Sequence, residues 1–243
     1  MKILNPQPVG GVKKRFSVCA KQFLYESRDI GIRIIEWIHL LKILGAEKIY
    51  LPIQHVHPDV LKVISYFEKI GLVESWQFFE PSNMSESGAY SYQTYMLQRN
   101  SWNDCFYRVK NLYEFVVVLD VDEVIMPNMP QDMNWEDMLK RISEVPADGF
   151  SSRWVNYPHF GNESLQTIPN YLFMLQHTQR SVEFREVAWY SRKSFFNTKT
   201  TEVVTAHFPI QCLTADRNCL TYDIPTNISQ TSHYRVPLEY NKY

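Results

Sequence analysis

An apolar run that ends abruptly in acidic residues constrains the fold of this chain more than any other feature. Residues 115–127 read FVVVLDVDEVIMP, in which five apolar residues precede Asp120, Asp122 and Glu123. An unbroken β-branched run of this kind is typical of a strand buried on both faces, as central strands of parallel sheets are. Ionised carboxylates cannot be buried there without partners, so we expect them at the carboxyl end of the strand, where α/β sheets bind ligands.

Asp120 and Asp122 are two residues apart, so their side chains project from the same side of an extended backbone. Such a pair of carboxylates suits a hard divalent cation. Acidic pairs after a strand also occur as solvated turn residues, but the third acid, Glu123, and the preceding apolar run favour a functional site. The sequence therefore predicts a cation-binding site at residues 120–123.

The segments before this run alternate between strand and helix patterns. Apolar stripes at helical spacing follow Asp29, a capping residue, and Pro58, which suits a first helical turn, and they end at Gly45 and Gly71. The predicted order is strand 16–20, helix 29–45, strand 49–53, helix 58–71, strand 73–79, helix 90–110 and strand 115–119. This alternation predicts an α/β fold with a mostly parallel central sheet and helices on both faces.

The chain after this run is less regular, but it contains no internal repeat, low-complexity tract or interdomain linker. We expect a short helix over residues 134–142 and three further strands over residues 149–155, 182–190 and 201–208. Residues 224–243 are expected to be largely irregular. Residues 1–15, with two prolines and two glycines, are typical of an entry segment or stalk. The 243 residues therefore predict this segment and one domain over residues 16–243.

The composition excludes several classes of protein. Hydrophobic residues make up 45% of the chain, which favours a folded globule. The net charge of -1, with no basic run longer than residues 13–15, gives no electrostatic case for nucleic-acid binding. No stretch approaches the ~18–20 apolar residues that span a bilayer, and no signal peptide is recognisable. We expect a soluble chain that would meet a membrane only through an anchor absent from this chain.

Cysteines and glycosylation patterns bear on the compartment. The four cysteines form no C-x-x-C metal pattern, although Cys212 and Cys219 could close a short loop. Acceptor patterns for N-glycosylation begin at Asn83, Asn162 and Asn227. Three such patterns suggest the secretory pathway.

Two kinds of enzyme use an acidic pair of this form. Phosphatases of the haloacid dehalogenase type have the pattern hhhhDxDx(T/V), which Val124 completes, with Asp120 as nucleophile and Asp122 as acid. That motif normally follows the first strand and needs a later acidic pair for magnesium, yet no Asp-Asp pair follows Glu123. A GT-A sugar-nucleotide transferase instead needs an acidic motif between a nucleotide-binding half and an acceptor-binding half, which is the order found here.

Further stretches make this second interpretation more specific. They are Ile35-Glu36-Trp37, Leu44-Gly45, Asn103-Asp104-Cys105, residues 113–127, Arg153-Trp154, Phe160-Gly161, Lys193-Ser194, His207 and His233-Tyr234-Arg235. With these stretches in this order, residues 16–235 resemble glycosyltransferase family 92. One departure is Asn162-Glu163-Ser164, where the family usually has small Ser or Gly residues, and it leaves the acceptor open.

The resemblance implies a GT-A fold and the lumenal domain of a Golgi type II membrane enzyme. It implies transfer of galactose from a UDP-sugar donor, UDP-galactose, to a glycan acceptor with inversion at the anomeric carbon. A divalent cation, Mn²⁺, would accompany the donor. The altered acceptor loop keeps a different class open, a non-catalytic carbohydrate-binding relative that retains the fold.

Chemistry and resemblance together assign candidate metal ligands. Asp122 is expected to bind the cation directly, with Asp120 at the cation or on the donor's ribose and Glu123 in support. A third ligand is expected from a late histidine, for which His207 is the first candidate and His233 the second.

Other residues are candidates for binding the donor and for catalysis. Glu36 is expected to line the nucleotide pocket, and Lys193 and Arg235 to meet the diphosphate. An inverting transfer needs a carboxylate that deprotonates the acceptor hydroxyl. Glu163 is favoured over Glu186 for this role because it lies in the expected acceptor loop.

Overall fold

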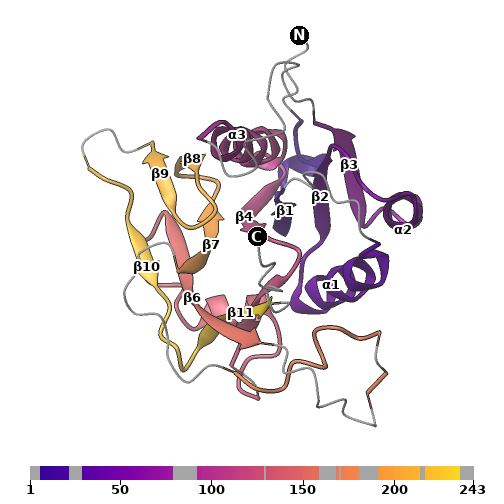
Figure 1. The fold of residues 1–243 in the computed structure, drawn as a ribbon. Coiled ribbons are helices and arrows are strands. Elements are labelled where there is room, and N and C mark those ends of the chain that lie inside the picture. The colour runs from indigo at the N-terminus through magenta and orange to yellow at the C-terminus, as the bar shows by residue number, and fades with distance from the viewer. Residues whose placement is uncertain are drawn as a thin grey trace.

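The structure, a computed structural model, describes residues 6–21, 29–78, 92–128, 130–158, 168–169, 171–180, 191–213 and 217–235. Its elements in chain order are η1 (Val9–Gly11), β1 (Lys14–Ala20), α1 (Gly31–Leu44), β2 (Lys48–Ile53), α2 (Pro58–Lys69), β3 (Val73–Gln77), α3 (Tyr92–Val109), β4 (Tyr113–Leu119), β5 (Glu123–Pro127), α4 (Trp135–Lys140), β6 (Gly149–Pro158), β7 (Arg192–Asn197), β8 (Thr201–Val204), β9 (Pro209–Cys212), β10 (Thr221–Asp223) and β11 (Ser229–Arg235) (Figure 1). Within these ranges, no helix has the length and apolar character needed to cross a membrane.

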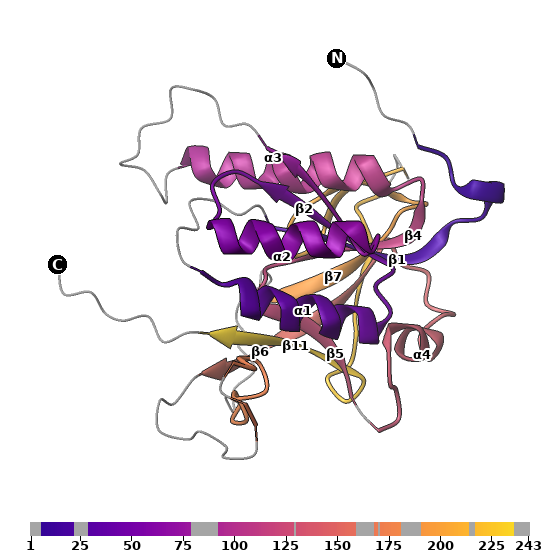
Figure 2. The same cartoon turned by 90° about the vertical axis from the view of Figure 1, so that its right-hand side faces the viewer.

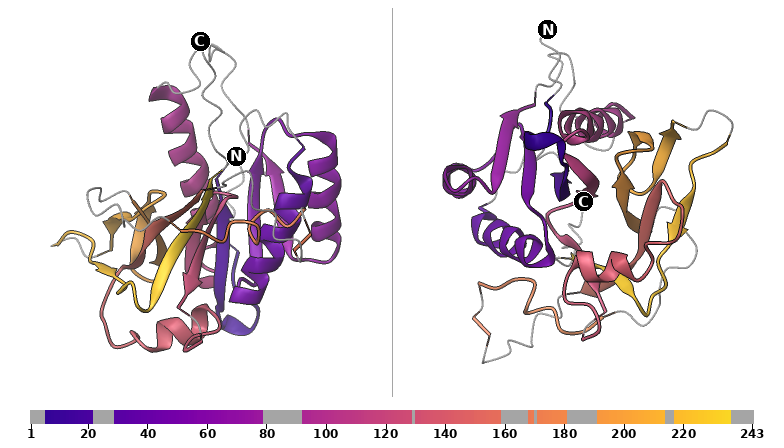
Figure 3. Two further views of the ribbon diagram at one scale, coloured as in Figure 1. Left: turned by 60° about the horizontal axis from the view of Figure 1, so that its bottom comes forward. Right: turned by 180° about the vertical axis from the view of Figure 1, so that it is seen from behind.

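The apolar run forms most of β4, and its side chains alternate between two cores. Val117 and Leu119 are buried with residues of α1, α2 and α4, whereas Val116 and Val118 are buried with residues of α3. Figure 3 shows α3 on one side of the strands and α1 and α2 on the other. The predicted central strand, buried on both faces, is therefore confirmed.

The large sheet has the strand order β3-β2-β1-β4-β7-β6-β11-β5, with β10 beside β6, and β8 and β9 form a separate hairpin. The first four strands are parallel. In the second half, β7 is antiparallel to β4 and β6, and β11 is parallel to β6 but antiparallel to β5. The predicted α/β class, with a mostly parallel sheet and helices on both faces, is confirmed.

The position of β5 decides where the acidic motif lies. Only residues 120–122 separate β4 from β5, yet β7, β6 and β11 lie between those two strands in the sheet. A flat sheet would set β4 and β5 about 19 Å apart, whereas four extended residues reach about 14 Å. The second half of the sheet must therefore curl, and β5, β6 and β11 lie side by side near α1 (Figure 2). The curl brings the acidic turn close to β7, β6 and β11.

Two expectations for the second half were wrong. Residues 224–243 were expected to be largely irregular, but β11 is an interior strand of the sheet. Its sequence is polar, and hydrogen bonds satisfy the buried hydroxyls, as between Ser229 Oγ and Ser152 Oγ (2.5 Å). The strand expected over 201–208 ends at Val204 and turns into β9. The strand expected over 182–190 lies outside the described residues.

Two disulfides connect elements of the fold. Cys212–Cys219 closes the short loop that the sequence suggested, with a sequence separation of 7. Cys19–Cys105, which the sequence did not indicate, joins β1 to α3. The adjacent Asn103 donates to the carbonyl oxygen of Val204 (3.0 Å) and accepts from its N–H (3.0 Å). The Asn-Asp-Cys stretch therefore fixes α3 to β1 and to β8.

Candidate active site

The acidic motif forms a closed turn at the carboxyl end of β4. The backbone N–H of Glu123 donates to the carbonyl oxygen of Asp120 (3.1 Å), and the N–H of Asp120 donates to Oε2 of Glu123 (3.2 Å). The N–H of Tyr234 in β11 donates to the carbonyl oxygen of Asp122 (2.8 Å). The turn is therefore tied both to itself and to the neighbouring strand.

Lys193 of β7 lies beneath this turn, with a side chain that is only 1% exposed. Its Nζ atom is 3.1 Å from Oδ2 of Asp120 and 2.8 Å from Oε2 of Glu123. Although burial alone would raise the pKa of Asp120, Lys193 and the nearby Lys21 hold that pKa well below its usual range. The pKa of Lys193 is raised, because the two carboxylates outweigh the effect of burial.

Glu123 is fully buried at the start of β5. Burial, with smaller contributions from Asp120 and Asp122, raises the pKa of this carboxyl group, and Lys193 opposes the shift. Its Oε2 atom contacts Lys193, and its Oε1 atom lies 3.7 Å from Nδ1 of His233. Glu123 therefore lies between the buried ammonium group of Lys193 and the imidazole ring of His233.

Asp122 differs from the other two acids, because its side chain is 42% exposed. Its Oδ2 atom lies 3.3 Å from Nε2 of His233. Over the described part of the chain, no lysine or arginine forms an ion pair with it. Asp122 is thus the carboxylate of this motif that faces solvent with its charge least compensated.

His207 lies near the same turn and, like His233, contacts the ring of Trp154. The indole ring centroid of Trp154 is 5.5 Å from the His207 ring and 5.2 Å from the His233 ring. Nδ1 of His207 is 2.9 Å from the carbonyl oxygen of Arg192, which can only accept, so Nδ1 carries the proton. Burial, reinforced by Lys193, lowers the pKa of His207 to about 4, so the ring is neutral at pH 7. Its Nε2 atom therefore has the lone pair that a metal ligand needs.

The structure describes only some of the remaining predicted residues. Glu36 accepts from the backbone N–H groups of Met174 (2.8 Å) and Leu175 (3.2 Å), so the structure places it against that segment. Arg235 ends β11, but its side chain is not described. Glu163 and Glu186 lie outside the described residues.

Sequence reasoning missed how Lys193 and Trp154 would be used. Trp154 contributed only to the family resemblance, and Lys193 was expected to meet a diphosphate. A signal was present, because Lys193 stands two residues before the phenylalanine pair Phe195-Phe196 of β7 (RKSFFN). A lysine in a buried strand of a chain with three clustered acids indicates an internal counter-ion.

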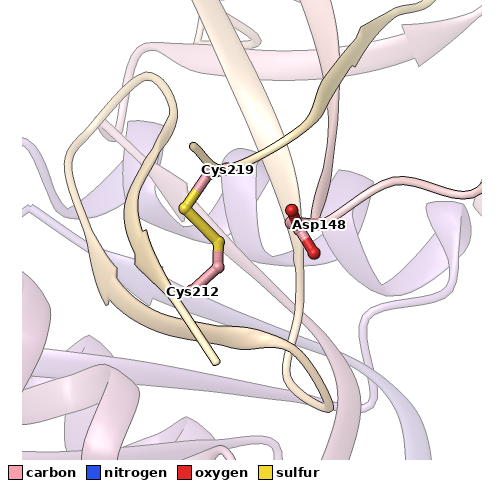
Figure 4. Close-up of side chains that lie close together, drawn as sticks. All are labelled: Asp148, Cys212 and Cys219. Atoms are coloured by element: carbon pink, nitrogen blue, oxygen red, sulfur yellow. A yellow bond between two sulfur atoms is a disulfide. The ribbon is translucent and has the colours of Figure 1, made fainter. Parts of the chain in front are cut away.

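Two other groups of ligand-type side chains occur among the described residues. Asp148 lies beside Cys212 and Cys219, but these cysteines form a disulfide and are not thiolates (Figure 4). Asp148 instead accepts from Arg217 (2.8 Å) and from the N–H of Leu220 (2.7 Å), and so holds the disulfide loop.

The second group consists of Asp29, His57 and Asp59 near the start of α1 and α2. Lys62 already pairs with Asp59 (2.7 Å), and Asp29 accepts from the N–H of Gly31 (2.9 Å). These contacts give both acids a structural role.

The acidic turn, by contrast, fits a divalent cation. It offers the exposed carboxylate of Asp122 together with imidazole nitrogens, which are donors that Mn²⁺ accepts. Across the described residues, no three of its side chains bring ligand atoms within 4.8 Å of one another.

Comparison with known proteins adds a family to this geometry. Residues 14–241 match glycosyltransferase family 92. No curated protein is similar enough to count as a match. Among solved structures, S. aureus TarS is similar with a TM-score of 0.45 and 13% identity, over 86% of this chain and 37% of that chain. TarS 1–349 in complex with UDP-GlcNAc gives a TM-score of 0.43 and 12% identity, over 86% and 58%. The chain thus spans less than two thirds of either structure.

Proposed function

This chain belongs to glycosyltransferase family 92, and on that premise we propose that it transfers a sugar from a nucleotide-diphosphate donor to a hydroxyl group of a glycan, with a divalent cation at Asp122. The observation that carries the proposal is the exposed carboxylate of Asp122, which lies 3.3 Å from Nε2 of His233. Asp120 and Glu123 flank it but are already paired with Lys193. The turn thus offers one carboxylate for a ligand.

Asp122 and His233 would hold the cation, with the neutral ring of His207 as the alternative nitrogen donor. When bound, the cation would stabilise the charge that develops on the leaving diphosphate. Asp120 is 26% exposed at the same rim, and its Oδ1 atom, which lies 3.4 Å from Nζ of Lys21, would be the oxygen that contacts the ribose of the donor. The protein would orient these two groups through the pairing of β5 with β11. His233 belongs to β11, and Asp122 lies in the turn before β5, where its carbonyl oxygen accepts from the N–H of Tyr234.

The finer assignments rest on the family. We include UDP-galactose as the donor, inversion at the anomeric carbon and Glu163 as the base that accepts the proton of the acceptor hydroxyl. We also include a location in the Golgi lumen. The phosphatase alternative has no support, because the acidic motif follows the fourth strand of the fold.

The test is release of UDP from a panel of UDP-sugars and glycan acceptors, with Mn²⁺ and with excess chelator. We expect release that requires Mn²⁺ and that Asp122→Asn abolishes. Asp104→Asn is the matched control, because Asp104 is 37% exposed and pairs with Arg108 on α3, away from the turn. Full activity of Asp122→Asn, or activity in chelator, would refute the metal role.

Two other outcomes separate the finer assignments. Turnover with another sugar would remove only the galactose assignment. Mn²⁺-dependent binding of UDP without turnover on any acceptor would indicate the non-catalytic relative.

A further inference from the structure

Lys193 is buried next to the acidic turn, and a lysine at such a place can have two roles. It can bind the phosphates of the donor, or it can serve as an internal counter-ion. The three N–H groups of Lys193 decide between them. One is directed to Oδ2 of Asp120 (3.1 Å) and one to Oε2 of Glu123 (2.8 Å). Nζ also lies 5.8 Å from the ring centroid of Trp154, within cation–π range.

The exposure of the side chain supports the second use. Only 1% of Lys193 is exposed, and Glu123 is not exposed at all. A donor phosphate could reach the ammonium group only by displacing one of the two carboxylates. A displaced Glu123 would then be a buried charge without a cation, which is among the most costly arrangements in a protein interior.

The geometry also shows what the ion pair would control. Glu123 lies directly opposite His233 in the β5–β11 ladder, and its second oxygen is 3.7 Å from Nδ1 of that ring. On the far side of the ring, Nε2 faces Asp122 at 3.3 Å. Glu123 is also the residue that closes the turn on Asp120, through both its backbone and its side chain.

We propose that Lys193 and Glu123 are positioning residues, a buried ion pair that holds Asp122 and the ring of His233 in place for the cation while Lys193 itself never contacts the donor. The inference rests on the proposed function, since it concerns the cation and the donor of the same site. It differs from the role expected from the sequence, in which Lys193 meets the diphosphate. Carboxylates that orient metal-binding histidines through a hydrogen bond typically change metal affinity about 10- to 100-fold when they are removed; at 3.7 Å, Glu123 acts on the His233 ring electrostatically.

The test is a double-mutant cycle of Lys193→Met and Glu123→Gln, with two measurements on each protein. The first is the concentration of Mn²⁺ needed for half-maximal binding of UDP, by calorimetry. The second is the thermal unfolding midpoint. Wild-type protein must first show Mn²⁺-dependent UDP binding; if it does not, the proposed function fails before the cycle begins.

We expect either single change to raise the required Mn²⁺ concentration about tenfold or more. The double variant should return to within about threefold of wild type, because the amide oxygen of the glutamine can still face His233 and no charge remains at position 123 or 193, while Asp120 keeps Lys21 as its partner. A direct contact between Lys193 and the donor predicts the opposite, since Glu123→Gln cannot restore a lost phosphate contact. A double variant as weak as Lys193→Met therefore overturns the proposal.

A purely structural role gives a third result. In that case Lys193→Met lowers the unfolding midpoint while folded protein keeps the wild-type Mn²⁺ requirement, which also overturns the proposal. Lys110→Met is the matched control for this outcome, because Lys110 forms a similarly short ion pair with Glu202 (2.7 Å), 15% exposed, near the opposite end of β4. If Lys193→Met does not fold, the double variant alone decides. A Mn²⁺ requirement within about threefold of wild type supports the proposal, and a weaker response to Mn²⁺ overturns it.

Discussion

His233 and Asp122 meet at 3.3 Å, with Nε2 of the imidazole facing Oδ2 of the carboxylate. The two residues come from β11 and from the turn before β5, and the antiparallel ladder between those strands brings them together. His207, the other histidine near this turn, also contacts the indole ring of Trp154, and its Nδ1 atom is held by the carbonyl oxygen of Arg192. His233 therefore faces the exposed carboxylate of Asp122, whereas His207 is held by the backbone of β7.

We predict that His233→Ala weakens Mn²⁺-dependent UDP binding and turnover together, by about tenfold or more. The reason is that Asp122 alone leaves too few protein ligands for the cation. His207→Ala should instead act mainly on stability, because the ring is held by the carbonyl of Arg192 and packs against Trp154. Calorimetric Mn²⁺ titration and thermal unfolding on the same samples measure both effects. A loss of Mn²⁺ dependence in His207→Ala, with His233→Ala unchanged, would reverse the assignment.

We predict that protonation of His207 contributes to acid unfolding. Folding lowers its pKa from 6.5 to about 4, so the unfolded chain binds this proton more tightly than the folded protein does. The stability that the neutral ring contributes is present above pH 6.5 and is lost as the pH falls toward 4. Unfolding midpoints measured between these values should fall less steeply for His207→Gln than for wild type. Equal slopes would contradict this prediction.

We predict that the two disulfides contribute unequally to stability. Loop-closure entropy gives about 4–5 kcal/mol for a link such as Cys19–Cys105 and about 2 kcal/mol for one such as Cys212–Cys219, because their sequence separations are 86 and 7. Paired Cys→Ala variants and denaturant unfolding measure the difference. A larger loss on removing Cys212–Cys219 would show that native contacts outweigh the effect on the unfolded chain.

We predict an N-glycan on at least one of Asn83, Asn162 and Asn227 when the chain is expressed through a secretory pathway. Asn227 is exposed in the connection between β10 and β11, whereas the other two lie outside the described residues. A glycosidase-sensitive mobility shift should appear, and Asn227→Gln should remove the part of it that this site carries. A chain whose mobility is unaffected by glycosidase would argue against a lumenal location.

Local sequence patterns were sufficient for the first half of the fold. The run at residues 115–119 predicted a strand with two buried faces, and Val116 to Leu119 alternate between the two cores as that requires. The acids after it were placed at the strand's carboxyl end by the cost of burying charge. These predictions succeed because they depend only on neighbouring residues. Side chains of a strand alternate between its two faces, and ionised side chains are costly to bury wherever the strand lies.

The partners of those acids were decided by the tertiary structure. Lys193, His233 and Trp154 come from three different strands, and they reach the turn because β5 returns across the curled end of the sheet. Nothing in the spacing of these residues specifies that path, and the polar sequence of β11 concealed an interior strand. Sequence therefore determined which side chains could bind a cation. The strand order determined that Lys193 pairs with Asp120 and Glu123 while Asp122 remains exposed beside His233.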